Sequence, residues 1–163
     1  IESGGRTLAV LGCGVDVVYP KENAALYDRI AESGAVISQF PMGMKPLAGN
    51  FPYRNRIVSG LAMGTVVIEA PLASGALITA RTAAEQGREV FAVPGQVGSV
   101  NSQGCHALIK QGAKLCESAD DILVELPALK GMLAAAQREC APAPEPAIVP
   151  VPEAPKRRPI TNA

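Results

Sequence analysis

Aromatic side chains and histidine are scarce in this sequence, and the chain carries no net charge. Its 163 residues include no tryptophan, three phenylalanines, three tyrosines and one histidine. The single histidine, His106, argues against a zinc site, and the few aromatic residues exclude an extended stacking surface. Fifteen basic residues balance fifteen acidic ones, so no overall field attracts nucleic acid. Any site for DNA must therefore be a local patch.

The spacing of the cysteines and the length of the apolar runs exclude further classes. Cys13, Cys105, Cys116 and Cys140 show no C-x-x-C or other spacing typical of metal ligands. A chain of this length with an α/β pattern needs no disulfide bonds, so we expect reduced thiols and a cytoplasmic protein. No apolar run reaches the roughly 18 residues of a membrane span, and the first residues do not resemble a signal peptide. We expect no metal, no cofactor and no membrane contact.

The order of apolar and turn-forming segments indicates one α/β domain over residues 1–126. Hydrophobic residues make up 48% of the chain and charged residues 18%, which is typical of a folded globular protein. Strand-like and helical segments alternate, and this predicts a doubly wound, mostly parallel sheet. We expect strands at 7–11, 35–38, 65–68, 89–93 and 114–116, and helices at 22–33, from residue 52, and at 74–86, 104–111 and 119–126.

The stretch 51–80 joins a cationic helix start to a strand and a second helix. Pro52 suits the first turn of a helix, because its missing N–H would have no intrahelical acceptor there. Arg54 and Arg56 follow at once. Residues 65–68 are β-branched throughout, which predicts a strand covered on both faces. Ser74 then indicates the N-cap of the next helix.

Helix starts beside the carboxyl ends of parallel strands favour a phosphate ligand. Gly75 has no Cβ and would let an anion approach the helix that begins near Ser74. Arg54 and Arg56 would add charge-assisted hydrogen bonds; the alternative for both is a surface salt bridge or a charge near a helix start. Phe51 is either a core residue or a ring on which a base stacks.

Two glycines, Gly12 and Gly14, follow the first predicted strand. A strand followed by G-x-G is typical of a phosphate-binding turn. No third glycine opens a helix directly after them, so a structural tight turn is favoured over a dinucleotide site.

Three separated motifs stand in one order along the chain. Residues 51–95 read FPYRNRIVSGLAMGTVVIEAPLASGALITARTAAEQGREVFAVPG, with TLAVLGCGVDVVYPKEN before them and CHALIKQGAKL after them. Together these motifs resemble the DNA-processing protein A family, also called DprA or Smf, over roughly residues 5–126. The resemblance implies a Rossmann-like fold of which this chain is the later part. The family's first βαβ portion, with GSR and SGxAxGID-like motifs, has no match here, and Ser3-Gly4-Gly5 is similar to the end of a helix that runs into a strand.

The resemblance implies a non-enzymatic protein that binds single-stranded DNA. It further implies that the protein loads the RecA recombinase onto that DNA in natural transformation (competence) or recombination, and that the full-length protein forms a homodimer. The DNA-binding residues that it implies lie in and around FPYRNR and at the next helix start: Lys45, Phe51, Arg54, Asn55, Arg56, Ser74 and Gly75. Some relatives have a basic residue just before the FP dipeptide; Lys45 is the nearest cation here.

The CHALIKQGAKL stretch lies, in the resembled family, near the surface for self-pairing and RecA contact. This implies a self-association role for His106, Ile109 and Leu115. The alternative for Ile109 and its neighbour Leu108 is that they cover the edge of the sheet, and for His106 it is packing.

A nucleotide-processing enzyme is the alternative function. Glu69 follows a predicted strand, where a carboxylate can be a general base. Rossmann-like nucleoside monophosphate phosphoribohydrolases carry a PGGxGTxxE motif, whereas the stretch here, GLAMGTVVIEA, keeps the GT and the glutamate without PGG. No partner base follows, and His106 has no nucleophile spaced around it. The DNA-binding module is therefore favoured, with no catalytic residues.

The composition changes after Leu126. Residues 127–140 are rich in alanine and leucine and predict a helix. Seven prolines occur in residues 141–163, which predicts a disordered linker in extended, polyproline-type conformations. The basic cluster Lys156-Arg157-Arg158 in this linker is interpreted as solvated charge, with a weak DNA contact as the alternative.

Overall fold

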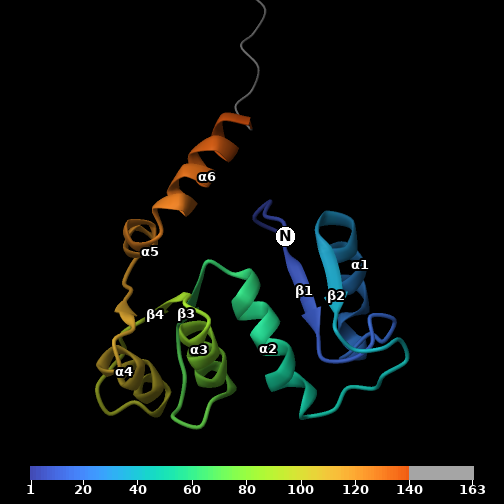
Figure 1. Cartoon of the computed structure of the whole chain (residues 1–163), viewed down its shortest axis with the longest axis horizontal. Helices are drawn as coiled ribbons and strands as arrows, with labels where there is room; N and C mark the ends of the chain where they lie inside the picture. Colours follow the sequence, from blue (N-terminus) through green and yellow to red (C-terminus); the bar gives the residue numbers. More distant parts are fainter. Residues whose placement is uncertain (140–163) are drawn as a thin grey trace, which may run out of the picture.

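The computed structural model describes residues 1–139, which form an α/β fold with parallel strands (Figure 1). The strands are β1 (Leu8–Leu11), β2 (Ala35–Ser38), β3 (Gly64–Val67), β4 (Glu89–Ala92) and β5 (Lys114–Leu115). The α-helices are α1 (Ala24–Ser33), α2 (Asn50–Leu61), α3 (Gly75–Glu85), α4 (Gln103–Lys110), α5 (Ala119–Glu125) and α6 (Pro127–Glu139). Two short 3-10 helices, η1 (Lys21–Asn23) and η2 (Val100–Ser102), precede α1 and α4. Every predicted element is present, with its ends shifted by at most two residues.

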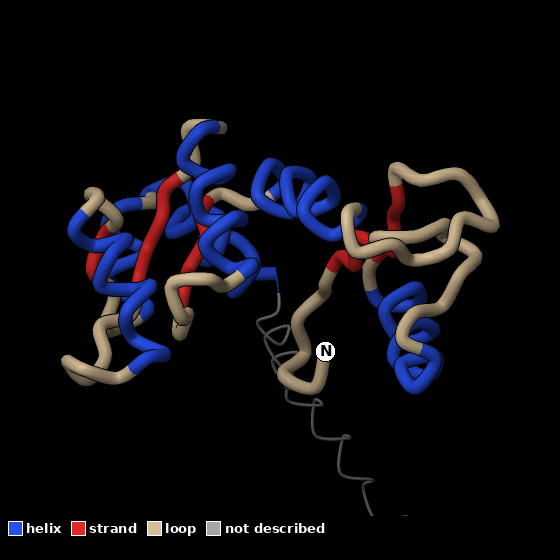
Figure 2. The backbone as a smooth tube through the Cα atoms, turned by 90° about the horizontal axis from the view of Figure 1, so that it is seen from below, coloured by secondary structure: helices blue, strands red, loops and turns tan. Residues whose placement is uncertain are grey.

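The strands form two hydrogen-bonded sheets rather than the one that the sequence predicts. β1 pairs with β2, and β4 pairs with both β3 and β5, in parallel throughout. Helix α2 connects β2 to β3 and lies between the two sheets in both views (Figures 1 and 2). Within residues 1–139, β1 and β3 therefore each have one edge without a partner strand. The prediction of an α/β fold with parallel pairing is confirmed; the single sheet is not what the described residues form.

The core lies between the second sheet and the helices α3 and α4. Its buried members are mostly small or β-branched, so the helices approach the strands closely. They are Val67, Ala70, Leu77, Ala80, Ala83, Val90, Ala92, Cys105 and Leu108. The other face of this sheet carries Phe91, which is fully buried, beneath the apolar side chains of Ile122 from α5 and Leu126 and Leu129 beside it. Helices thus cover both faces of β4, the central strand.

The expectation that residues 65–68 are covered on both faces is wrong. Val67 points into the core and is 4% exposed, whereas Val66 is 36% exposed and Ile68 is 64% exposed. The reason is that β3 is an edge strand: α3 covers the face that carries Val67, and the opposite face is only partly covered.

Serine caps begin two of the helices, and the one at Ser74 is predicted by the sequence. The Ser74 side chain accepts a hydrogen bond from the Ala76 N–H at the start of α3. At α5, Ser118 and Asp121 form a capping box. Hydrogen bonds from the backbone N–H groups of Glu117 and Ser118 and from the Ser118 hydroxyl lower the pKa of the Asp121 carboxyl.

Of the predictions for the C-terminal part of the chain, one falls within the described residues. The helix predicted at 127–140 corresponds to α6. Cys140, the predicted linker at 141–163 and its basic cluster lie outside the described residues. Among the residues described, no helix is both long and apolar enough to cross a bilayer.

A methyl group added at Gly104 should destabilise the fold. The Gly104 N–H donates to the Ala70 carbonyl at 2.8 Å, and a Cβ there would lie 2.4 Å from that oxygen and 3.0 Å from the Ala70 Cβ. We expect Gly104→Ala to lower the free energy of unfolding by about 1–3 kcal/mol, as overpacking does. Urea unfolding followed by circular dichroism measures the effect.

Gly131→Ala is the matched control, because nothing lies within 4 Å of the position that its Cβ would take in α6. This variant should be neutral or stabilised by up to about 1 kcal/mol. Equal midpoints for Gly104→Ala and the parent protein would contradict the contact with Ala70.

Candidate functional site

The first turn of α2 packs against the loop that follows β1. The Asn50 amide donates to the Gly12 carbonyl at 2.9 Å. The Phe51 ring lies over Gly12 so closely that an added Cβ would come within 3.1 Å of it. Pro52 is the third residue of the helix, two positions later than predicted but still in its first turn. Glycine at position 12 is therefore what lets α2 begin at the carboxyl end of β1.

The glycines in the turn after β1 allow other parts of the chain to pack closely against it. Gly12 and Gly14 are both buried. The Gly14 N–H donates to the Met44 carbonyl at 2.8 Å, and a Cβ on Gly14 would lie 2.6 Å from the Pro41 carbonyl oxygen. Since the Phe51 ring covers Gly12 and the backbone of residues 41–44 lies beside Gly14, a dinucleotide phosphate has no access to either glycine. The geometry agrees with the tight turn that the sequence favours.

An arginine lies on the Phe51 ring. The guanidinium carbon of Arg54 is 5.7 Å from the ring centroid, which is a cation–π arrangement. Its Nη1 donates to the Val10 carbonyl, and its Nε donates to the Asn55 side-chain oxygen at 3.0 Å. Asn55 thus orients Arg54. Within residues 1–139, the Nη2 group has no protein acceptor and can serve an anion.

Tyr19 completes this aromatic group, and the sequence reasoning missed it. Its ring centroid lies 6.2 Å from that of Phe51, with the ring planes inclined at 47°. Tyr19 is 54% exposed, although the chain has only six phenylalanine and tyrosine residues in total. The exposure of such a scarce kind of side chain indicates a binding role, and only the structure shows that exposure. We call Tyr19, Phe51 and Arg54 the aromatic–arginine cluster.

Two further predicted cations lie near the start of α2 in the chain, and neither forms a hydrogen bond with this cluster among residues 1–139. Arg56 is exposed, and its Nη2 donates to the Gln39 side-chain oxygen at 2.7 Å. Lys45 is exposed in the loop between β2 and α2. Both side chains are accessible to a phosphate backbone that passes the first turn of α2.

The start of α3 is a separate part of the predicted site. No contact joins Ser74 or Gly75 to the aromatic–arginine cluster in the described residues. A Cβ added at Gly75 would meet nothing within 4 Å, so the backbone there is open to a ligand. Figure 1 shows that α2 and α3 begin on the same side of the molecule, toward which β1 and β2 run. The two parts therefore share one edge of the fold.

The buried thiol of Cys13, beside the cluster, is unreactive. Cys13 is 2% exposed, and its Sγ donates to the Val17 carbonyl at 3.2 Å. Burial raises the pKa of the Cys13 thiol, the Asp16 carboxylate raises it further, and Arg54 opposes both. At neutral pH the thiol is protonated and is a poor nucleophile.

Glu69 and His106, the residues considered for the enzymatic alternative, hold loops together. A Glu69 carboxylate oxygen accepts from the Asn101 amide at 3.3 Å, while the Asn101 carbonyl accepts from the Ala70 N–H at 2.8 Å. His106 Nε2 lies 3.0 Å from the Gly95 carbonyl oxygen. Each group thus binds the loop that follows β4 to the rest of the same sheet edge.

The residues predicted for self-association differ in exposure. Ile109 packs against the core as a partly buried side chain, and its neighbour Leu108 is a core residue. His106 is half-buried. Leu115, in the edge strand β5, is 48% exposed and is the member of the set that is open to a partner.

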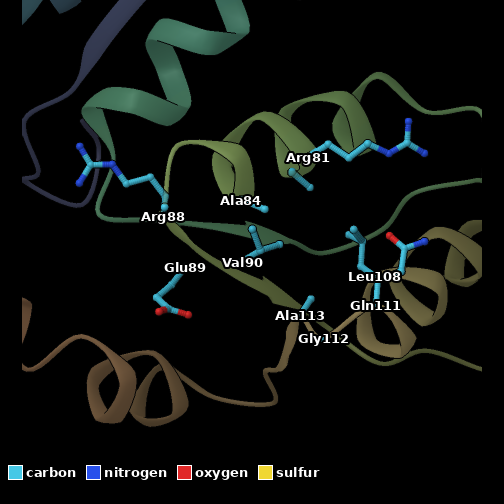
Figure 3. Close-up of a pocket in the computed structure, with 11 residues that line it drawn as sticks. Arg81, Ala84, Arg88, Glu89, Val90, Leu108, Gln111, Gly112 and Ala113 are labelled. Carbon is cyan, nitrogen blue, oxygen red and sulfur yellow. The ribbon is translucent and has the colours of Figure 1, made fainter.

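A cavity of about 360 Å³ lies at the opposite edge of the second sheet, where β4 and β5 begin. Its two arginines point in opposite directions across Val90 and Leu108 (Figure 3). Arg88 donates to the Gly60 carbonyl at 2.7 Å, whereas Arg81 extends outward from α3. Because their charges do not converge, this cavity is no match for the anion site that the sequence predicts.

The chain matches a known protein family over most of its length. The model of the family described as DNA recombination-mediator protein A matches residues 1–127. The chain belongs to this family. The chain is 50% identical over 127 residues to protein Smf of Escherichia coli, and this covers 77% of the chain and 34% of Smf.

Two solved structures of the family resemble the chain. One is the X-ray structure of DNA processing protein A (DprA) from Streptococcus pneumoniae, with a TM-score of 0.70, 49% identity and coverage of 76% of this chain and 44% of that one. The other is DprA from Helicobacter pylori, described by its single-stranded DNA binding mode, with a TM-score of 0.67, 27% identity and coverage of 75% and 56%. The chain spans less than half the length of the curated S. pneumoniae and E. coli relatives.

Alkylation tests whether the Cys13 thiol is unreactive in the folded protein. Because burial and Asp16 raise the pKa of its thiol, we expect iodoacetamide at pH 7 to modify Cys13 far more slowly in the folded protein than in urea. Peptide mass spectrometry follows the modification, with the denatured protein as the control. Rapid labelling of the folded protein at Cys13 would contradict the raised pKa.

Proposed function

We propose that this protein binds single-stranded DNA at the edge of the fold where α2 and α3 begin. It delivers this DNA to the RecA recombinase as a non-enzymatic DNA-processing protein of the cytoplasm, in natural transformation or recombination. The observation that carries the proposal is the stacking of Arg54 on Phe51 at the carboxyl end of β1. That the H. pylori relative is described by its single-stranded DNA binding mode supports it.

The chemistry of the α2 start suits an unpaired strand. Arg54 offers its Nη2 group to a phosphate, since its Nε and Nη1 bind Asn55 and Val10. Arg56 adds a second, exposed guanidinium. Lys45 adds an exposed cation on the neighbouring loop. An aromatic ring beside these charges accepts the face of a base, and every base has such a face, so this binding tolerates any sequence.

The α3 start supplies the second phosphate position. The first N–H groups of a helix have no intrahelical acceptor, and the helix dipole favours an anion there. Gly75 leaves that backbone uncovered. A strand that follows the edge from α2 to α3 would meet arginines first and backbone N–H groups next.

The contacts of Glu69 and His106 favour binding over catalysis. Each group holds the loop after β4 through a hydrogen bond, Glu69 with Asn101 and His106 with the Gly95 backbone. A structural role explains both groups without a reaction, and this supports a non-enzymatic role for the edge.

The proposed partners other than DNA are RecA and a second copy of the full-length protein. The end of the second sheet supports this assignment, because β5 is an edge strand with the exposed Leu115, and Val124 of α5 nearby is 78% exposed. Apolar side chains beside an open strand edge are typical of a pairing surface.

The phosphate contacts predict a specific change in salt dependence. Arg54→Ala and Arg56→Ala should weaken binding of oligo-dT and mixed-sequence strands alike, and each lost contact should reduce the log–log salt slope by roughly 0.7. Gly75→Asp should weaken binding more, because it places a negative charge at the helix start. A salt titration of strand binding measures these effects, with circular dichroism to verify folding.

Arg81→Ala is the charge-matched control, since Arg81 is exposed on α3 beside the cavity at the opposite edge. It should leave affinity and slope unchanged. Folded α2 variants that bind with the parent's affinity and slope would place the DNA elsewhere. Release of a base from nucleoside monophosphates would favour the enzymatic alternative instead.

The self-association surface predicts an effect at Leu115. We expect Leu115→Lys to convert the dimer to a monomer without unfolding it, because the substituted side chain is already exposed in the single subunit. Leu72→Lys, at a position 60% exposed in the loop before α3, should leave the dimer intact. Light scattering gives the oligomeric state. A parent protein that is monomeric, or a dimer unaffected at Leu115, would exclude this surface.

A further inference from the structure

The exposed ring in the aromatic–arginine cluster belongs to Tyr19 rather than to Phe51. One side of Phe51 meets the Gly12 backbone, where an added Cβ would lie 3.1–3.2 Å from two ring carbons. The Arg54 guanidinium lies over the ring, 5.7 Å from its centroid. Phe51 is accordingly half-buried, whereas Tyr19 beside it is 54% exposed. The surface that a ligand can reach is mainly that of the tyrosine.

We infer that Tyr19 is a base-stacking residue that binds one unpaired base of single-stranded nucleic acid. Phe51 and Arg54 are then its supports: the phenylalanine holds the tyrosine from the side, and the arginine supplies positive charge for the adjoining phosphate. The inference rests on the proposed function, because it names the group that receives the base at the same edge.

The loop that carries Tyr19 is braced on several sides. The Asp16 carboxylate oxygens accept from the Gly43 N–H at 2.8 and 3.0 Å. The Tyr27 hydroxyl donates to the Val15 carbonyl at 2.5 Å, and the Ser38 hydroxyl donates to the Cys13 carbonyl at 2.6 Å. These bonds fix the loop to α1, to β2 and to the segment before α2. A ring on such a support loses little freedom when a base binds, which favours binding.

An exposed ring of this kind selects for unpaired bases. In a duplex each base is stacked on its neighbours and its faces are covered, so the ring has nothing to receive. In a single strand the faces are free, and the π-face of any base can stack on tyrosine. The ligand class is therefore single-stranded nucleic acid of any sequence, with Tyr19 contributing the preference over duplex.

DNA oligomers with and without bases distinguish base stacking from phosphate contact. Tyr19→Leu should lower the affinity for a dT oligomer by roughly 5- to 150-fold, the range for loss of one aromatic–base stack. Its affinity for an abasic oligomer of equal length should equal the parent's, and the salt slope should not change, because no phosphate contact is lost. Tyr19→Phe keeps the ring and should bind as the parent does.

Tyr53→Leu is the matched control. Tyr53 is 68% exposed on α2, only two residues from Phe51, and this variant should bind the dT oligomer as the parent does. The chain has no tryptophan, so tyrosine emission can be read directly. Stacking should quench part of the parent's emission on adding dT, and this part should be missing in Tyr19→Phe, whose binding is retained.

The outcomes distinguish this inference from the proposed function. A parent that binds the dT oligomer while Tyr19→Leu binds it equally well would overturn the role of Tyr19 and leave the function intact. A loss at Tyr19→Leu that is as large on the abasic strand, or is matched by Tyr53→Leu, would overturn stacking. A parent that binds neither strand would overturn both proposals. Quenching that persists in Tyr19→Phe would assign the base to another ring.

Discussion

The contact between Gly12 and the first turn of α2 is the constraint on which the candidate site depends. Without a Cβ at Gly12, the Phe51 ring lies directly on the loop after β1, and Asn50 donates to the Gly12 carbonyl. That contact determines where the helix begins. It places Arg54 over the ring and Tyr19 at its side, so the exposed charges and rings of the site follow from one close approach of backbone to side chain.

The edge proposed to bind DNA carries two kinds of group that can hold an anion. At α2 the positive charge is carried by side chains, and its strength falls as salt rises. At α3 it is carried by backbone N–H groups beside Gly75, whose position the Ser74 cap fixes. Net charge is zero over the whole chain, so in the proposed function these local groups, and not a general field, would determine where a phosphate binds.

Local patterns predict the elements well because each depends on neighbours in the sequence. The β-branched run near residue 66 and the cap at Ser74 specify a strand and a helix almost to the residue. The division into two sheets was not predicted, because strand pairing depends on residues far apart in the chain. Tyr19 was missed for the same reason: its exposure depends on how Gly12 and Phe51 meet, and η1, α1 and β2 separate Tyr19 from Phe51 in the chain.

Helix α2 also has a mechanical role, since it is fixed at both ends. Its first turn is attached to Gly12 beside the first sheet. Its second half is attached to the second sheet's side of the molecule: the Gln86 side chain bonds Ser59 and the Arg56 carbonyl, and Arg88 bonds the Gly60 carbonyl. The helix therefore forms a rigid connection between two sheets that share no hydrogen bond within residues 1–139. A force on DNA bound at Arg54 would pass along α2 into the second sheet, whose far end is the edge strand β5.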